Sequence, residues 1–257
     1  MLKLENINKT FYPGTPDETI LFQHFNLTVK KDAFISVIGS NGSGKSTMLN
    51  LLCGTLIPDS GQILLNDKDI TKVKDFERAS YIARVYQDPS RGSCGSFSIL
   101  ENMALADNKG KAYGFGHAIN KDRLDFYRTQ LEQLHLGLEN RLNDKVKNLS
   151  GGQRQALAII TATLTPHDIL ILDEHTAALD PKTADNIMEL TNEIVEKKKL
   201  TTIMVTHNLK FALQYGNRLL MMHQGEAIMD KDGEEKQKVE LNEVLDKFNE
   251  ISIELGN

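Results

Sequence analysis

The chain of 257 residues has no tryptophan, two cysteines and six prolines. Cys53 and Cys94 lie in dissimilar segments, so they give neither a disulfide framework nor a zinc site. Long apolar runs are also lacking, because stretches such as 169–172 and 219–222 fall far short of the roughly 20 residues that cross a bilayer. We therefore expect neither a disulfide-rich secreted domain nor a membrane-spanning chain.

The charge balance and the first residues exclude further classes. With 30 basic and 35 acidic residues the formal net charge is -5, so no global basic field indicates nucleic acid, and we expect no nucleic-acid partner. Residues 1–6 lack a long apolar segment and a small-residue cleavage site, so we expect no secretory signal and a cytoplasmic location. The length fits one large domain, with room for an inserted subdomain.

A glycine-rich segment directly after the apolar run 34–38 carries the strongest functional signal. Its residues match the P-loop pattern, and they are Gly39, Ser40, Asn41, Gly42, Ser43, Gly44, Lys45, Ser46 and Thr47. In such a loop the backbone N–H groups wrap the phosphates, while Lys45 and Ser46 are placed for the β- and γ-phosphates and Mg²⁺. This motif alone predicts binding of a nucleoside triphosphate.

Two more segments add phosphate chemistry. Ser150, Gly151, Gly152 and Gln153 stand where a helix is expected to begin, a place where free N–H groups and the helix dipole favour an anion. The apolar strand 169–172 ends in Asp173 and Glu174, which in a P-loop protein places Asp173 beside the metal and lets Glu174 polarise water. An acidic strand end alone is as often structural, but beside a P-loop the catalytic interpretation is favoured.

The order of predicted elements indicates an α/β fold. We expect strands at 2–7, 27–29, 34–38, 62–65 and 81–86, with a helix at 45–53 after the P-loop. A glycine- and serine-rich segment at 90–98 is expected to be a mobile loop, and 99–148 to be helical. From Ser150 helices alternate with strands at 169–172, 202–205 and 219–222, which predicts a largely parallel sheet. We expect one amphipathic helix in the tail at 234–248.

Taken together, these motifs resemble the nucleotide-binding subunit of an ATP-binding cassette (ABC) transporter. The resemblance covers nearly the whole chain and implies a single ABC ATPase domain over residues 1–257. Its implied fold is an α/β P-loop NTPase with a RecA-like parallel-sheet core, an antiparallel β subdomain and an inserted α-helical subdomain at about 90–150. A helical C-terminal tail follows at about 233–257.

The resemblance also gives the two phosphate-binding segments one meaning. Segment 149–153 corresponds to the family signature, which caps the γ-phosphate held by the P-loop of a second copy. Two ATP molecules with Mg²⁺ are then sandwiched in a head-to-tail dimer. Asp180 resembles the aspartate that communicates across that dimer, and it also fits an N-cap before Pro181.

The remaining site residues follow from the same resemblance. Glu174 is the implied general base, Gln87 reaches Mg²⁺ and the attacking water, and His207 contacts the γ-phosphate. Ser46 and Asp173 complete the implied metal ligands. Phe11 is favoured for stacking on adenine, although Tyr12 also qualifies.

The implied partners are integral membrane permease subunits and an extracytoplasmic substrate-binding protein, with the chain held at the inner face of the membrane. His175, where a proline is usual, and the surrounding segment 173–183 resemble a bacterial subgroup whose permeases are like those of branched-chain amino-acid importers. Some systems of this subgroup carry aromatic amino acids. Because the permeases of the subgroup are like those of importers, we expect an importer of a small solute such as an amino acid.

The alternative is a soluble ABC ATPase without a transport role, such as the iron–sulfur assembly ATPase. That branch has acidic and lysine residues after the signature glycines, whereas Gln153, Arg154 and Gln155 favour transport. DNA-repair members carry long insertions and translation-associated members two cassettes, and neither feature is present. A simple P-loop kinase would have no use for the signature.

Overall fold

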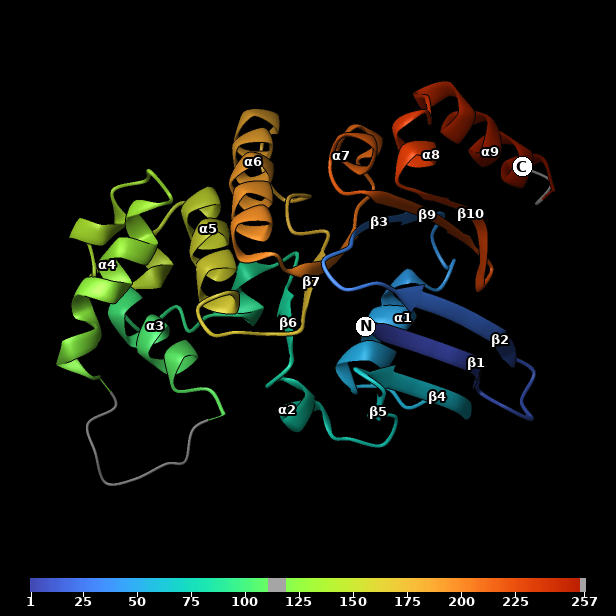
Figure 1. Cartoon of the computed structure of the whole chain (residues 1–257), viewed down its shortest axis with the longest axis horizontal. Coiled ribbons are helices and arrows are strands. Elements are labelled where there is room, and N and C mark those ends of the chain that lie inside the picture. The colour runs from blue at the N-terminus through green and yellow to red at the C-terminus, as the bar shows by residue number, and fades with distance from the viewer. Residues whose placement is uncertain (111–118, 255–257) are drawn as a thin grey trace. The chain divides into compact units, whose positions relative to one another are not determined.

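The computed structural model describes residues 1–110 and 119–254 and forms two compact units (Figure 1). Unit 1 comprises Met1–Ala79 with Leu200–Asn257, and unit 2 comprises Ser80–Lys199. Parts of the expected helical segment 99–148 and of the tail, namely 111–118 and 255–257, lie outside the described residues. No helix of the described ranges is long and apolar enough to cross a membrane.

Unit 1 contains an antiparallel sheet in the strand order β2-β1-β4-β5. Its strands are β1 (Leu2–Phe11), β2 (Thr19–Val29), β4 (Ser60–Leu65) and β5 (Lys68–Asp69). The predicted strands at 2–7, 27–29 and 62–65 are present but longer than expected. Register shifts between β1 and β2 near Ile7 and Lys9 break the alternation of apolar and polar residues, which is the signal that sequence reasoning follows.

The second group of strands in unit 1 surrounds β3 (Phe34–Gly39), which is buried along its whole length. β3 runs parallel to β8 (Thr201–Val205) and to β9 (Arg218–His223), and β10 (Glu226–Asp232) pairs antiparallel with β9. Helix α1 (Lys45–Cys53) follows β3, and helix α7 (Leu209–Gln214) follows β8. The short helix α2 (Asp75–Arg78) lies just before Ala79, where the first segment of unit 1 ends. The parallel strands and α1 match the prediction, whereas β10 was not predicted because its charged residues resemble a solvated turn.

The prediction of one tail helix at 234–248 is wrong. The tail forms two helices, α8 (Glu234–Gln237) and α9 (Leu241–Glu254). The buried Lys236 donates from Nζ to the carbonyls of Leu213, Tyr215 and Gly216 at 2.6, 2.9 and 2.9 Å, which fixes α8 against the end of α7. The chain then turns before α9, whose Val244 is buried in a cluster with Leu219 and Met221.

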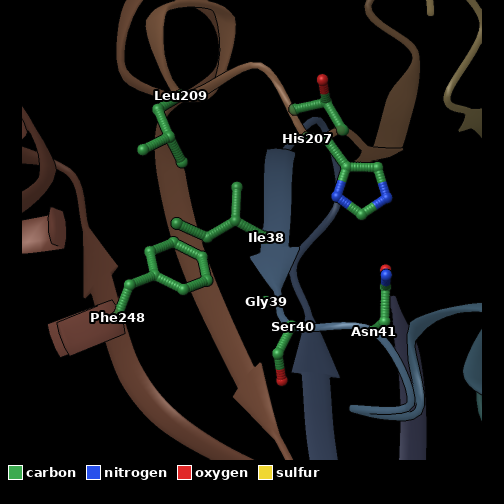
Figure 2. Close-up of a pocket in the computed structure, with 8 residues that line it drawn as sticks. Ile38, Gly39, Ser40, Asn41, His207, Leu209 and Phe248 are labelled. Carbon is green, nitrogen blue, oxygen red and sulfur yellow. The ribbon is translucent and has the colours of Figure 1, made fainter. Parts of the chain in front are cut away.

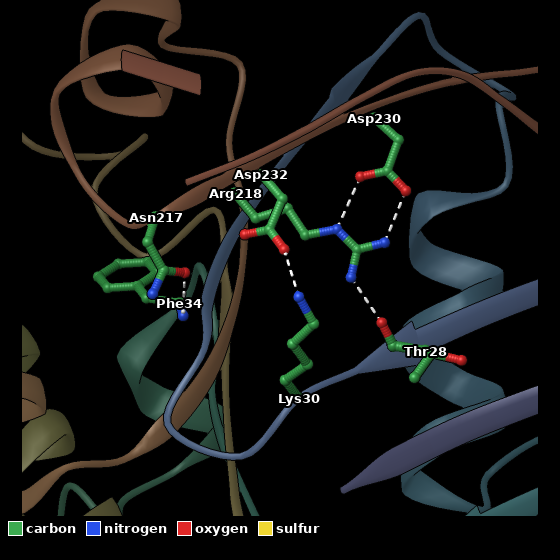
Figure 3. A network of polar contacts seen from close by, with 7 residues as sticks. All are labelled: Thr28, Lys30, Phe34, Asn217, Arg218, Asp230 and Asp232. Carbon is green, nitrogen blue, oxygen red and sulfur yellow. Dashed lines mark hydrogen bonds and ion pairs between the residues drawn. The ribbon is translucent and has the colours of Figure 1, made fainter. Parts of the chain in front are cut away.

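A polar network ties β9 and β10 to the end of β2 and to the start of β3 (Figure 3). Arg218 donates two hydrogen bonds to Asp230 at 2.7 and 2.6 Å and a third to the carbonyl of Thr28. The hydrogen bonds that Arg218 donates to Asp230 raise the pKa of Arg218, so its guanidinium stays charged. Asn217 accepts the N–H of Phe34 at 3.0 Å, which anchors the strand that leads into the P-loop.

Unit 2 has the parallel strands β6 (Ile82–Val85) and β7 (Ile169–Asp173), with helices α3 (Ile99–Asp107), α4 (Leu124–Glu132), α5 (Gly151–Ala162) and α6 (Pro181–Lys198). Its 3-10 turns are η1 (Pro89–Arg91), η2 (Lys121–Arg123), η3 (Leu138–Asn140) and η4 (Val146–Asn148). In the 90–98 segment the side chain of Asn102 accepts the N–H of Cys94 at 2.8 Å and donates to its carbonyl at 3.0 Å. Sequence reasoning predicted a loop here but not these contacts.

Candidate functional site

The glycine-rich loop between β3 and α1 has a backbone that only glycine fits. Gly39, Gly42 and Gly44 have φ values of +150°, +77° and +101°. A Cβ atom on Gly39 would lie 2.1 Å from the carbonyl oxygen of Met222, and one on Gly44 would lie 2.9 Å from the ring of Phe22. The loop is therefore held in a tight curve by close packing as well as by backbone conformation.

Helix α1 begins in this loop, and the first N–H groups of a helix have no acceptor within the helix itself. Gly44 occupies the N-cap position, and no side chain caps the helix there. The buried Lys45 folds back over the loop, with Nζ donating to the carbonyls of Gly39 and Ser40 at 2.8 Å each and to Oγ of Ser43 at 3.3 Å. The N-terminus of a helix, its dipole and one ammonium group together make a cradle suited to phosphate.

The turn between β9 and β10 supports this cradle from behind. Gly225 donates its N–H to the carbonyl of Ser43 at 3.0 Å, and a Cβ atom there would lie 1.6 Å from the carbonyl oxygen of Leu21. On the neighbouring strand, Nδ1 of His223 lies 3.3 Å from Oγ of Ser40. Sequence reasoning missed both residues, and the only local signal for Gly225 is a glycine turn between two strands.

His207 and residues of the P-loop line the same pocket (Figure 2). The exposed imidazole of His207 and the side chain of Asn41 lie on one side of the pocket, and Ile38, Leu209 and Phe248 lie on the other. His207 follows β8, so the parallel pairing of β3 with β8 explains why the two strand ends converge. The place of Phe248, from α9, was not predicted.

In unit 2 the end of β7 carries the two predicted carboxylates. Oδ2 of Asp173 accepts a hydrogen bond from Nη2 of Arg84 on the adjacent strand at 2.6 Å. Glu174 leaves the strand with a φ of +49°, and its carbonyl accepts the N–H of Ala177 at 2.9 Å. The left-handed residue turns the chain sharply after β7, so Glu174 starts a tight loop instead of extending the strand.

His175, which follows Glu174 and stands where the family resemblance leads us to expect a proline, is buried. Its exposed fraction is 2%, and its Nε2 lies 3.3 Å from Oγ1 of Thr191 in α6. The Thr191 hydroxyl donates to the carbonyl of Ile187 at 2.6 Å, so its oxygen is left to accept from the imidazole. Burial lowers the pKa of His175 to about 4, so the side chain is neutral at pH 7.

The predicted signature residues form the start of α5. Ser150 is the N-cap and exchanges hydrogen bonds with Gln153 in a capping box, with Gln153 N–H donating to Ser150 Oγ at 3.2 Å. A Cβ atom on Gly152 would lie 2.5 Å from Cγ2 of Thr183, so this glycine allows close packing on α6. Gly151 is half-buried and Ser150 is exposed at this helix end.

Asp180 caps α6, as its position before Pro181 predicts. Its carboxylate accepts the N–H of Thr183 at 3.1 Å, and hydrogen bonds from Thr183 hold the pKa of the carboxyl below its usual range. Because Thr183 also touches the Gly152 position, the starts of α5 and α6 are coupled. Asp180 itself is exposed.

The three other predicted residues lie at strand ends. Gln87 is exposed just after β6, where the preceding carbonyl of Tyr86 accepts a hydrogen bond from Nε2 of Gln155 at 3.3 Å. Phe11 ends β1 and is half-buried, with Nζ of Lys9 5.8 Å from its ring centroid. Tyr12 follows with 68% of its surface exposed, so both aromatic residues keep some surface for stacking.

Each predicted metal ligand offers the kind of donor atom that a hard cation prefers. Ser46 is exposed at the start of α1, and Asp173 supplies a carboxylate in unit 2, so both donors are oxygen atoms. Within residues 1–110 and 119–254 no three His, Cys, Asp or Glu side chains gather as a metal site. Mg²⁺ is typically held by one or two protein oxygens with substrate phosphates and water, and the chemistry of each of these two side chains fits such a ligand.

The strand–loop–helix cradle, the basic residue folded into it and the acidic end of a parallel strand define a P-loop nucleotide-binding protein. Comparison with known families narrows this class: the profile described as "ABC transporter" matches residues 22–177. The chain belongs to the ATP-binding subunits of the ABC transporter family, which bind ATP and hydrolyse it to power transport. The expected P-loop NTPase fold is confirmed.

Three relatives illustrate the likeness. The "Tyrosine transport ATP-binding protein" of Clostridioides difficile (strain R20291) is 44% identical over 248 residues, which cover 96% of this chain and 98% of that protein. The "Energy-coupling factor transporter ATP-binding protein EcfA2" of Clostridium tetani (strain Massachusetts / E88) is 33% identical, covering 89% of this chain and 78% of that protein. The dimeric post-hydrolysis structure of the ATP-binding cassette MJ0796 bound to ADP and Pi is 30% identical, with a TM-score of 0.74 and coverage of 90% and 98%.

Proposed function

We propose that this subunit dimerises head to tail around two ATP molecules and powers the import of a small solute, an aromatic amino acid being favoured. The cradle at the start of α1 carries the proposal. Its uncapped helix N-terminus, its strained glycines and the ammonium of Lys45 converge on one place. This arrangement is typical of a site that binds a phosphate group.

The proposed nucleotide contacts begin with the loop itself. The backbone of the segment 39–47 surrounds the phosphates, and Lys45 leaves the loop carbonyls to balance charge on the β- and γ-phosphates. Phe11 stacks on adenine. This assignment over Tyr12 is supported by Phe11 being fixed at the end of a strand, which costs less ordering entropy than a residue in an exposed turn.

Ser46, Asp173 and Gln87 are the proposed protein ligands of Mg²⁺, directly or through water. When bound, the cation supplies charge neutralisation at the β- and γ-phosphates. The oxygen-only donor set and the absence of a wider acidic cluster among the described residues support this assignment.

Glu174 is the proposed general base for hydrolysis. Its carboxylate accepts a proton as a water oxygen forms a bond to the γ-phosphorus, while the bond from that phosphorus to the β–γ bridging oxygen breaks and ADP leaves. His207 contacts the γ-phosphate from beside the P-loop, which is supported by its exposed position in the pocket with Asn41. Catalysis then rests on positioning and charge, with no covalent intermediate.

The proposed dimer explains why one chain carries two anion sites. The start of α5, with Ser150, Gly151, Gly152 and Gln153, covers the γ-phosphate held by the P-loop of a second copy. Asp180 lies at the start of the adjacent helix α6, so it is suited to report on that contact. The dimeric relative with ADP and Pi supports this assembly.

The proposed transport role places the subunit at the cytoplasmic face of the membrane, docked on permease subunits. An extracytoplasmic substrate-binding protein would deliver the solute. The relative named for tyrosine transport supports an aromatic amino acid, and the transporter names of the relatives favour this role over iron–sulfur assembly.

The Glu174→Gln variant tests the hydrolysis mechanism. Amide replacement keeps size and removes the base, so we expect ATP affinity within about twofold of wild type and a hydrolysis rate lowered by about 10²-fold or more. A Glu189→Gln variant, at an exposed position of α6 in unit 2, is the matched control and should hydrolyse ATP normally. Normal hydrolysis by Glu174→Gln would show that another group is the base.

Uptake measurements test the substrate. Cells that lack this chain should lose accumulation of labelled tyrosine but not of branched-chain amino acids, and the wild-type chain, unlike Lys45→Ala, should restore it. Equal tyrosine uptake with and without the chain would overturn the proposed substrate class.

A further inference from the structure

Asp173, the proposed metal ligand, is held by an ion pair that the sequence analysis did not identify. Nη2 of Arg84 donates to Oδ2 of Asp173 at 2.6 Å, and the two side chains are only 11% and 18% exposed. β6 and β7 are parallel, with Arg84 opposite Ile171 and Val85 opposite Leu172. The contact therefore joins neighbouring strands near the end at which Asp173 and Gln87 emerge.

The pair engages one carboxylate oxygen of Asp173. In the described part of the chain, Oδ1 of Asp173 accepts no hydrogen bond, while Oδ2 is occupied by the guanidinium. A carboxylate rotates about a broad torsion, so fixing one oxygen also fixes the direction of the other. Arg84 thus restricts Asp173 without occupying both of its oxygens.

Arg84 is in turn held by an aromatic ring. Its Cζ lies 4.8 Å from the ring centroid of Tyr86, and Cζ of Arg91 lies 4.9 Å from the same ring. A guanidinium is planar by resonance, and an aromatic ring beside it limits the orientations that the group adopts, which pre-organises it for hydrogen bonding. Tyr86 immediately precedes Gln87, and Arg91 ends the 3-10 turn that follows.

We propose that Arg84 is a positioning residue for the metal site, which holds Oδ2 of Asp173 and so presents Oδ1 to the cation. Tyr86 braces the guanidinium of Arg84 and connects this carboxylate to the segment that carries Gln87. The inference rests on the metal role of Asp173 in the proposed function. Partners that orient metal-binding carboxylates commonly contribute about 10- to 100-fold to affinity.

The opposite electrostatic effect is also measurable. A guanidinium beside a carboxylate repels a divalent cation, so Arg84 would weaken metal binding if charge outweighed orientation. The short, largely buried ion pair and the nearby ring of Tyr86 favour orientation. The two effects predict opposite signs for the same variant.

The test uses Mn²⁺ as the probe, with its binding to the full chain measured by electron paramagnetic resonance at saturating ADP. We expect Arg84→Leu to weaken Mn²⁺ binding about tenfold or more, while the affinity for ADP in EDTA stays unchanged. Arg84→Lys keeps the charge but cannot both stack and donate through a planar head, so it should fall between wild type and Arg84→Leu. The matched control Arg91→Leu removes the other cation on Tyr86, leaves the ion pair in place, and should retain Mn²⁺ affinity within about twofold.

Unchanged or tighter Mn²⁺ binding in Arg84→Leu would overturn the inference. Asp173→Asn separates this failure from that of the proposed function: if it also leaves Mn²⁺ affinity unchanged, Asp173 is not a ligand. If Asp173→Asn weakens binding and Arg84→Leu does not, only the role of Arg84 is wrong. Should Arg84→Leu fail to fold, Arg84→Lys carries the test, and wild-type Mn²⁺ affinity in that variant would contradict the orienting geometry.

Discussion

The buried imidazole of His175 makes the stability of the protein depend on pH in a defined range. Burial lowers its pKa in the folded protein from 6.5 to about 4. Between these values the unfolded chain binds a proton that the folded chain excludes, so the free energy of unfolding falls as the pH is lowered. The stabilisation is complete above pH 6.5 and is lost as the pH approaches 4.

The magnitude follows from that interval. At about 1.4 kcal/mol per pH unit, the separation of 6.5 from about 4 corresponds to about 3 kcal/mol of stability. This is a large part of the roughly 5–15 kcal/mol that stabilises a typical domain. The effect should therefore be visible in an equilibrium unfolding experiment on the metal-free protein.

Urea unfolding at pH 7 and at pH 4, in EDTA, measures this contribution. We expect the loss of stability between the two pH values to be about 3 kcal/mol smaller in His175→Leu than in the wild type. Thr191→Val is the matched control, because it removes the hydroxyl beside His175 and keeps the imidazole buried. It should be less stable at both pH values and retain the wild-type pH dependence. Equal pH dependence in wild type and His175→Leu would refute the reasoning.

Two further substitutions test features that support the site. Gly225→Ala should destabilise unit 1 by more than about 2 kcal/mol and weaken ATP binding, because φ is +82° and the new Cβ would lie 1.6 Å from the Leu21 carbonyl oxygen. The control is Gly14→Ala, where φ is +75° but no atom lies near the new Cβ. It should lower the stability by only about 1–2 kcal/mol. Nucleotide titration and urea unfolding measure both, and similar values for the two variants would contradict the steric argument. Lys236→Met should lower the free energy of unfolding by about 1–3 kcal/mol, because it leaves carbonyls at the end of α7 without a donor. The control Lys238→Met, at an exposed position of the same tail, should stay within about 0.5 kcal/mol of wild type. No difference between these two lysine variants would argue against the capping role.

Features that depend on local sequence were predicted well. The P-loop and the helix from Lys45 to Cys53 follow from glycine spacing and from a run of apolar residues, and the structure has α1 with the same bounds. Asp180 as an N-cap follows equally from the residue before a proline. Such signals are read within a few residues, where chain geometry leaves few choices.

Features that depend on distant contacts were not predicted. Gly225 meets the P-loop from about 180 residues away, and the Arg84 side chain meets Asp173 across 89 residues of sequence. The break between α8 and α9 depends on carbonyls that lie 20 to 23 residues before Lys236. No periodicity reports such contacts, because they arise only when segments distant in the sequence pack together.

The family resemblance supplied most of the candidate site. From residue types alone, His207 is one of seven histidines and Gln87 is an ordinary surface glutamine. The structure adds a physical basis for His207, which shares a pocket with Asn41. The roles of these residues in hydrolysis stay predictions.

The mass of the Glu174→Gln variant with saturating ATP and Mg²⁺ tests the central claim, that two copies complete each ATP site. Light scattering should give about twice the 28.8 kDa of the chain with ATP, and the single-chain mass with ADP. Adding Ser150→Phe to this variant should abolish the ATP-dependent dimer without changing ATP binding to the P-loop. A single-chain mass at saturating ATP, or a dimer that survives the Ser150 substitution, would contradict the account.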